Sequence, residues 1–322
     1  MTSTGSNPFD RMPSDTGWHA LTDSATKREL LSQDLYFREC WADVTDAFGP
    51  DAHDALAPLA LLSFKCDGIA GRRAGATLDF LAGNGFTVLA TAGIRHNRHS
   101  MRELWRYNWH VYTTDRLELM TLMHGAGDSL MLIVRDDRYD GIIPAAVRLA
   151  DLKGSADPAK RGPEHLRTVL APPNQIINFV HVADEPADIV RETGIFLDRP
   201  GRLRLLEDVV TALKNDGHGG RAAAEERLAS LEAACPASDF DLDAAFDRLG
   251  NAKLASPAAL STLRTAAAGG TPLTWDELTA LVAPQTGGWD FVRVATAVLS
   301  ADRPGGPDLL PPSSADAWRA RA

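Results

Sequence analysis

The residues that could carry out chemistry lie first in the stretch QIINFVHVADEP, where an apolar run ends on His181. Asn178 precedes the histidine and Asp184 follows it, each three residues away. A neutral imidazole is a competent nucleophile near pH 7, and carboxylates are common partners of its second nitrogen. Glu192 lies 11 residues after His181, far enough for a following helix to bring its carboxylate back beside the ring. Taken alone, His181 would be read as a core histidine and Glu192 as a solvated helix residue.

Two other segments carry cations at positions that could bind phosphate. Lys65 ends the short apolar run PLALLSFK, and Arg167 ends the segment LKGSADPAKRGPEHLR. A guanidinium presents a fork of donors that matches phosphate oxygens, whereas an ammonium acts as a point charge. Considered singly, both residues also fit a solvated surface, so their meaning depends on whether the fold brings them to His181.

The bulk composition narrows the class of protein. Hydrophobic residues make up 44% of the 322 residues and charged residues 24%, as in a globular chain. The formal net charge of -10 argues against nucleic acid as a partner. The three cysteines, Cys40, Cys66 and Cys235, form no CxxC pair, so neither a zinc site nor a disulfide framework is predicted. No signal peptide and no membrane span is evident, and we expect a soluble, cytoplasmic protein.

Apolar patterning predicts four strands that alternate with helices. Helical spacing of apolar residues, with Asn84-Gly85 as a stop signal, predicts the first of these helices. In the last helix we expect Asp184 as the N-cap and Pro186 in the first turn. The strands are expected at 58–65, 86–92, 129–135 and 175–181, and the helices at 74–83, 99–127 with a break, 144–152 and 184–197. This order fits a ferredoxin-like split βαβ sheet with antiparallel neighbours, and a doubly wound parallel sheet is the alternative.

Three of these segments together resemble the nucleoside diphosphate kinase family. Its first strand ends in a KPDG-like motif, where this chain has KCDG beginning at Lys65. Its phosphate loop reads GATDPAxAxPGTIR, where this chain has GSADPAKRGPEHLR ending at Arg167. Its active-site strand reads NxxHGSDS before a helix that bears a glutamate, where this chain has NFVHVADE and then Glu192. The segments occur in the family's order over residues 58–200.

The resemblance implies a role for each matching residue. His181 corresponds to the histidine that takes the γ-phosphate of ATP, and Glu192 to the carboxylate that orients its ring. Lys65 and Arg167 correspond to the cationic clamp on the phosphates. Further matches are Asn178, as a contact to the sugar and the active-site network, and Arg148, as a second phosphate arginine although its spacing from Gly154 is two residues too long.

The resemblance also implies ATP as the phosphate donor, with Mg²⁺ held by the nucleotide phosphates and no metal site on the protein. The acceptor would be a nucleoside diphosphate or another small molecule, and the kinetics would be ping-pong through a phosphohistidine. Family members assemble into oligomers, so a homo-oligomer is one expectation. The aromatic residue that stacks on the base is not identified, and the candidates are Trp105, Tyr107, Trp109 and Tyr112.

The chain departs from the family pattern close to the expected nucleophile. Val182-Ala183 stands where the family has Gly-Ser, Cys66 replaces a proline, and Ala156 replaces a threonine. These changes remove two hydroxyl groups and predict an altered acceptor or rate. They also favour the alternative hypothesis of a non-catalytic relative that binds nucleotide or protein, with the helical C-terminal region mediating interactions.

The predicted fold class is therefore α+β, a four-stranded antiparallel sheet of the nucleoside-diphosphate-kinase type with an all-helical C-terminal region. Start signals for the C-terminal helices include Ser256-Pro257 and a capping box of Thr274 with Glu277. The expected organisation is a flexible leader at 1–20, a helical N-terminal extension at 21–57, the kinase-like domain at 58–200, a helical region at 201–300 and a loose tail at 301–322.

Overall fold

A four-stranded sheet forms the centre of the protein in a computed structural model that describes residues 10–302, 309–310 and 313–321. The strands are β1 Leu59–Phe64, β2 Phe86–Ile94, β3 Ser129–Asp136 and β4 Val180–Val182. They lie in the order β2-β3-β1-β4, and every neighbouring pair is antiparallel. This is a ferredoxin-like arrangement. The antiparallel prediction is confirmed, and the doubly wound parallel alternative is wrong.

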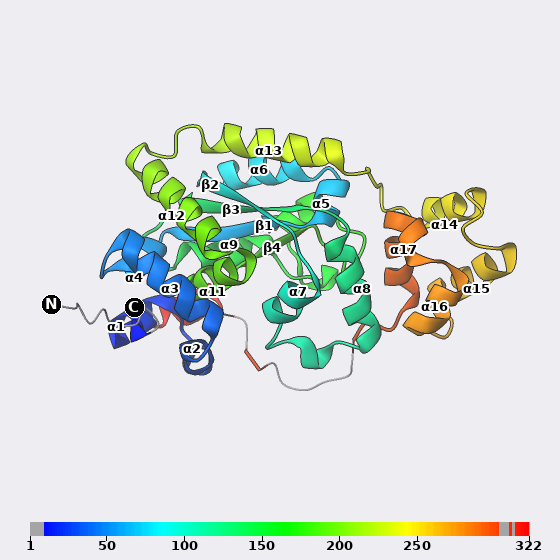
Figure 1. The fold of residues 1–322 in the computed structure, drawn as a ribbon, viewed down its shortest axis with the longest axis horizontal. Coiled ribbons are helices and arrows are strands. Elements are labelled where there is room, and N and C mark those ends of the chain that lie inside the picture. Colours follow the sequence, from blue (N-terminus) through cyan, green and yellow to red (C-terminus); the bar gives the residue numbers. More distant parts are fainter. Residues whose placement is uncertain (1–9, 303–308, 311–312, 322) are drawn as a thin grey trace.

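Helices cover both faces of the sheet. All six residues of β1 are buried, as are nearly all of β3. Because successive side chains of a strand point to opposite faces, such continuous burial requires cover on both sides. Figure 1 shows α6 Ala74–Gly83 and α13 Gly220–Ala234 on one side of the sheet, and α9 Ala145–Lys153 and α11 Pro186–Phe196 on the other.

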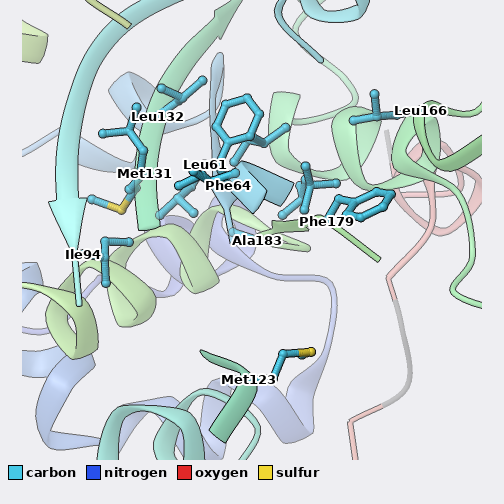
Figure 2. Close-up of a cluster of buried hydrophobic side chains, with 14 of the residues drawn as sticks. Leu61, Phe64, Ile94, Met123, Met131, Leu132, Leu166, Phe179 and Ala183 are labelled. Atoms are coloured by element: carbon cyan, nitrogen blue, oxygen red, sulfur yellow. The ribbon is translucent and has the colours of Figure 1, made fainter. Parts of the chain in front are cut away.

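The buried cluster in Figure 2 joins the sheet to the segments that flank it. Leu61 and Phe64 of β1 lie beside Met131 and Leu132 of β3, and Phe179 lies next to them at the start of β4. All five side chains are fully buried. The strands are therefore held in place by a closely packed apolar core.

The remaining helices mostly follow the predicted pattern. Side chains cap many of their first turns, including Ser256 and the capping box of Thr274 with Glu277, as predicted. The helices are α1 Asp15–Leu21, α2 Ala25–Ser32, α3 Leu35–Phe48, α4 Ala52–Leu56, α5 Cys66–Ala70, α7 Arg98–Leu104, α8 Thr114–Gly125, α10 Leu166–Leu170, α12 Arg199–Lys214, α14 Leu242–Asn251, α15 Pro257–Ala267, α16 Trp275–Leu281, α17 Pro284–Val298 and α18 Ala315–Arg319, with 3-10 turns η2 Trp109–Val111 and η3 Pro158–Lys160.

The fourth strand is much shorter than the predicted 175–181. The Asn174 side chain accepts hydrogen bonds from the N–H groups of Ile176 and Ile177, each at 2.9 Å, and so forms a turn. Phe179 then has a left-handed backbone with φ of 71°. Ile176, Ile177 and Phe179 are buried although they do not pair in the sheet, and this burial produces the apolar pattern from which a strand was predicted.

The helix after β4 begins one residue later than predicted. Glu185, not Asp184, occupies the N-cap position in an extended conformation, and its N–H donates to the Asp188 carboxylate at 3.1 Å. Pro186 is in the first turn, as predicted. Asp184 does not cap the helix, and its carboxylate instead lies 3.4 Å from the Lys153 ammonium.

The two ends of the described chain are more structured than the terms leader and tail imply. Residues 15–20 of the expected leader belong to α1, in which Trp18 and Leu21 are buried. Residues 315–319, within the expected tail, form α18 with Trp318 buried. A single tryptophan in each segment supplies the apolar area that fixes it to the rest of the protein. Residues 1–9, 303–308, 311–312 and 322 of these two segments lie outside the described residues.

The C-terminal helices α14–α17 pack on one another at one end of the molecule, where α17 also contacts α8 (Figure 1). In the described residues after 200 the chain forms helices and no strand of the sheet, as predicted.

Among the described residues, no helix has both the length and the apolar character that crossing a lipid bilayer requires.

The packing of the N-terminal helices on α11 can be tested at Gly194. A Cβ atom there would lie 2.3 Å from the Tyr36 carbonyl oxygen of α3, so Gly194→Ala must separate the two helices. We expect the free energy of unfolding to fall by about 1–3 kcal/mol. Gly75→Ala in α6, where a Cβ would meet nothing within 4 Å, should instead raise it by about 0.5–1 kcal/mol. Urea unfolding measures both, and equal effects would contradict the packing described here.

Candidate active site

A cavity of about 380 Å³ lies beside β4, a volume within the range of small-molecule sites. Five of the six predicted site residues line it, namely Lys65, Arg167, Asn178, His181 and Glu192. Further walls come from the N-terminal extension, the α7–α8 segment and the loop after α9. Their residues are Lys27, Leu31, Leu104, Trp105, Tyr107, Asn108, Tyr112, Arg116, Met120, Met123, His124, Lys153, Ala156, Gln175, Ile176, Val180, Asp184, Asp188, Arg191 and Leu310.

His181 and Glu192 form a close pair at the edge of this cavity. His181 is the middle residue of β4, and Glu192 lies in the second turn of α11. The His181 Nε2 atom is 2.9 Å from each Glu192 carboxylate oxygen. A carboxylate at that distance accepts a hydrogen bond from Nε2–H, which places the free electron pair of the neutral ring on Nδ1. The arrangement produces an oriented imidazole with one available nucleophilic nitrogen.

Lys65 follows the last residue of β1 and is buried, with 4% of its surface exposed. Its ammonium lies 3.3 Å from the Asp67 carboxylate and 3.4 Å from the Ile176 carbonyl oxygen. Burial and the nearby Arg167 lower the pKa of Lys65, against the opposing effect of Asp67. A buried ammonium that is destabilised in this way would gain from an additional anion.

Arg167 is the clearest case of a buried charge without a carboxylate partner in the described part of the chain. Only 8% of its surface is exposed, yet its guanidinium donates only to the main-chain carbonyls of Gly154, at 2.9 Å, and Val180, at 3.4 Å. Its Nε–H is buried with no hydrogen-bond partner among the described residues. Burial, and then the charge of Arg161, lowers the pKa of Arg167 to about 10. Because an unpaired buried charge is costly, this geometry indicates a place for an anionic ligand.

Asn178 lines the cavity, but part of its hydrogen-bonding capacity is used within its own turn. Its side-chain amide donates to the Gln175 carbonyl oxygen at 2.8 Å. The amide therefore shapes the turn that leads into β4. One N–H and the carbonyl oxygen of the side chain are left for other partners.

The structure does not bring Arg148 to the site. Its guanidinium pairs with Asp136 at 2.6 Å, donates to the Asn84 carbonyl oxygen at 2.7 Å and lies over the Phe86 ring. These partners belong to the β2–β3 end of the sheet, and Arg148 is absent from the cavity lining. A residue on α9 at this helical position faces away from the loop that follows the helix, and Arg148 therefore has a structural partner elsewhere.

Lys153, in the same helix, is a cavity-lining cation that the sequence analysis missed. It ends α9 directly before Gly154 and lines the cavity. Among the described residues its ion-pair partner is the Asp184 carboxylate, at 3.4 Å, and burial lowers the pKa of Lys153 despite that partner. Its position next to the loop glycine was a signal that could have been recognised.

The N-terminal extension contributes a second cation that the sequence analysis missed. Lys27 of α2 is buried between the carboxylates of Glu185 and Asp188, at 2.7 Å from each, and also lines the cavity. Both carboxylates outweigh the effect of burial and raise the pKa of Lys27. No local pattern in α2 marks this lysine, because its partners lie about 160 residues away in sequence.

Three of the four candidate aromatic residues line the cavity. Trp105 packs edge-on against the His181 ring at 6.1 Å between centroids, and Tyr107 and Tyr112 lie further along the wall. The Arg116 guanidinium covers the face of Tyr112 at 3.9 Å. Trp109 is 52% exposed and is not part of the lining.

Within the described residues, no three His, Cys, Asp or Glu side chains gather closely enough to hold a metal ion. Of the carboxylates in the cavity wall, Asp188 pairs with Lys27 and Asp184 with Lys153, and Glu192 is hydrogen bonded to His181.

Comparison with solved structures finds similarity to nucleoside diphosphate kinases, at low sequence identity to this chain. The enzyme from Aquifex aeolicus aligns with a TM-score of 0.36 at 17% identity, over 44% of this chain and 96% of the other. The enzyme from Encephalitozoon cuniculi aligns with a TM-score of 0.37 at 12% identity, over 45% of this chain and 91% of the other. A halophilic enzyme from Halobacterium salinarum, in complex with CDP, aligns with a TM-score of 0.35 at 16% identity, over 44% of this chain and 89% of the other. No protein-family model matches the chain, and no curated protein matches it. Similarity at this level assigns no family, and the function proposed below rests on the geometry of the site.

The uncompensated charge of Arg167 leads to a prediction for anion binding. We expect inorganic pyrophosphate to bind the protein, and Arg167→Met to weaken its affinity roughly 10- to 100-fold, because hydrogen bonds to charged groups contribute about 1.5–3 kcal/mol. Arg148→Met, which removes an arginine outside the cavity, should leave the affinity unchanged. Isothermal titration calorimetry measures all three proteins, and equal affinities for the two variants would refute the assignment.

Proposed function

We propose that this protein is a phosphotransferase that transfers the γ-phosphate of ATP to His181 and then to a nucleoside diphosphate or another small acceptor. The observation that carries the proposal is the His181–Glu192 pair, which lies in one cavity with buried cations that lack full counter-charge. An oriented neutral imidazole supplies the nucleophile, and the cations supply charge for phosphate oxygens.

In the first half-reaction, the electron pair of His181 Nδ1 attacks the γ-phosphorus of ATP. The bond between that phosphorus and the bridging oxygen breaks, and ADP leaves with its electron pair. Nε2–H remains hydrogen bonded to Glu192, whose negative charge stabilises the ring as it becomes positively charged. Mg²⁺ would accompany the nucleotide and neutralise part of the charge on its phosphates.

In the second half-reaction, an oxygen of the acceptor attacks the same phosphorus, and the N–P bond electrons return to Nδ1. Lys65, Arg167 and Lys153 are the candidates for neutralising the equatorial oxygens in both directions. A terminal phosphate of a nucleoside diphosphate is already anionic at neutral pH, so this acceptor requires no general base.

Replacement of the family's Gly-Ser by Val182-Ala183 has a local structural basis. Both residues are fully buried, Val182 pairs with Leu62 of β1, and the Ala183 N–H donates to the Leu61 carbonyl oxygen at 3.1 Å. They extend the core beneath His181 and provide no hydroxyl group toward the cavity. An active enzyme of this kind would therefore stabilise the transferring phosphate through its cations and other donors.

The test of the proposal is to incubate the protein with γ-labelled ATP and Mg²⁺. Wild-type protein should acquire a label that is acid-labile and alkali-stable, as expected of a phosphohistidine, and His181→Ala should acquire none. Nucleoside diphosphates should then discharge the label. If ATP binds but neither wild-type protein nor any variant is labelled, phosphotransfer is refuted and the non-catalytic binding alternative is favoured.

The role of Glu192 can be tested in the same assay. Glu192→Gln keeps the size of the side chain and removes its charge, and we expect the rate of labelling to fall roughly 10- to 100-fold, the usual cost of losing a partner that orients a histidine. Glu207→Gln, at an exposed position of α12, is the matched control and should label at the wild-type rate. An undiminished rate in Glu192→Gln would show that the carboxylate does not assist the reaction.

A further inference from the structure

A row of ring contacts connects His181 through Trp105 to two buried histidines, His124 and His96. Trp105 packs edge-on against His181 at 6.1 Å and is tilted against His124 at 5.4 Å. His124 in turn packs edge-on against His96 at 5.8 Å. Neither His96 nor His124 was singled out as a site residue from the sequence, and the mechanism above does not use them.

His124 differs from an ordinary core histidine in its hydrogen bonding. It lies in the last turn of α8, only 1% of its surface is exposed, and it lines the cavity. Its Nδ1 atom is buried and has no partner among the described residues. An N–H left unpaired in a protein interior is costly, so the hydrogen bonding of this ring bears on which nitrogen carries the proton.

The surroundings of His124 keep it neutral. Burial lowers its pKa well below the usual value, and the positive charge of nearby Lys65 lowers it further, followed by His96 and His181. His96 is neutral for the same reason, because burial lowers its pKa to about 4. A neutral imidazole carries a single proton, on either Nδ1 or Nε2.

The unpartnered Nδ1 atom indicates which tautomer is present. An N–H group without an acceptor is rarer in protein interiors than an acceptor without a donor. The proton of His124 is therefore assigned to Nε2, and Nδ1 is the unpaired acceptor. Because the ring lines the cavity and its Nδ1 atom is buried, Nε2–H is the polar group that is available to a ligand.

We propose that His124 donates a hydrogen bond from Nε2–H to a phosphate oxygen of the substrate beside Lys65, which makes it a further substrate-binding residue. This inference rests on the proposed function for the identity of the ligand. A neutral donor transfers no proton during the reaction and requires no counter-ion, so it can stabilise charge on the phosphate in a crowded cationic site. It would supply a donor in a cavity whose lining includes Ala156, a residue without a hydroxyl group.

The first experiment is on the wild-type protein. The nitrogen chemical shifts of its histidines should show His124 as a neutral Nε2–H tautomer between about pH 5.5 and 7.5, a range of about 1 unit on either side of the ordinary histidine pKa. Adding inorganic pyrophosphate should shift the His124 signals more than those of His96, which lies behind His124 and outside the cavity lining. An Nδ1–H tautomer, or unchanged His124 signals at saturating pyrophosphate, would overturn the inference.

The second experiment uses His124→Phe, which keeps the ring shape, and His124→Gln, which restores a donor. Single-turnover labelling by γ-labelled ATP should be slowed roughly 10- to 100-fold in His124→Phe and largely recovered in His124→Gln. His96→Phe is the matched control for packing and should label at nearly the wild-type rate. Equal losses in His124→Phe and His96→Phe, accompanied by equal losses of thermal stability, would assign His124 a packing role and refute the proposal.

The two proposals fail in distinguishable ways. If wild-type protein is never labelled, but pyrophosphate perturbs His124 and His124→Phe weakens pyrophosphate binding, phosphotransfer is refuted and the hydrogen bond to the anion is supported. If wild-type protein is labelled and His124→Phe matches it in rate and in affinity for pyrophosphate, the role of His124 is refuted and phosphotransfer is supported.

Discussion

The pairing of β4 with β1 is the contact on which the rest of the site depends. It comprises three residue pairs and sets His181 opposite Ser63, two residues before Lys65. The Phe179 carbonyl oxygen accepts from the Lys65 N–H at 3.0 Å and would lie 2.5 Å from any Cβ on Gly68. A slip of one residue would turn His181 to the other face of the sheet and separate it from Glu192. The glycine at position 68 and the left-handed backbone of Phe179 make this close approach of the two segments possible.

Charge is the second constraint on the site. Asp184 and Asp188 pair with Lys153 and Lys27, whereas among the described residues Arg167 is hydrogen bonded only to carbonyl oxygens. A site of this kind is costly for the free protein, because burial lowers the pKa values of Lys65, Lys153 and Arg167. The cost is acceptable where an anion offsets it on binding. Buried charges without matching partners, which lower the stability of the folded protein, are typical of functional sites. They are not expected in a structural ion-pair network, where each charge has an opposite partner.

The sequence predicted those features that depend on local patterning. The positions of three long strands and of most capped helices follow from apolar periodicity. The contact of His181 with Glu192 was expected from the resemblance to the nucleoside diphosphate kinase family, and the spacing of the two residues allows a helix to return beside a strand. The short β4 was mispredicted because Asn174 and Phe179 form a turn within an apolar run. Arg148 was mispredicted because the match considered spacing along the chain, whereas the helix turns this residue toward Asp136. Lys27 could not be predicted, since its place in the site depends on tertiary packing alone.

The N-terminal extension is part of the site. Lys27 and Leu31 of α2 line the cavity directly. Asp34, which caps α3, accepts from Arg191 of α11 at 2.7 Å, and Arg191 also lies over the ring of Tyr107 in the opposite wall. The extension thus links the helix that carries Glu192 to the segment that carries the aromatic residues. Because Lys27 and Leu31 form part of the lining, any ligand of the cavity meets a wall that the sheet and its covering helices do not supply by themselves.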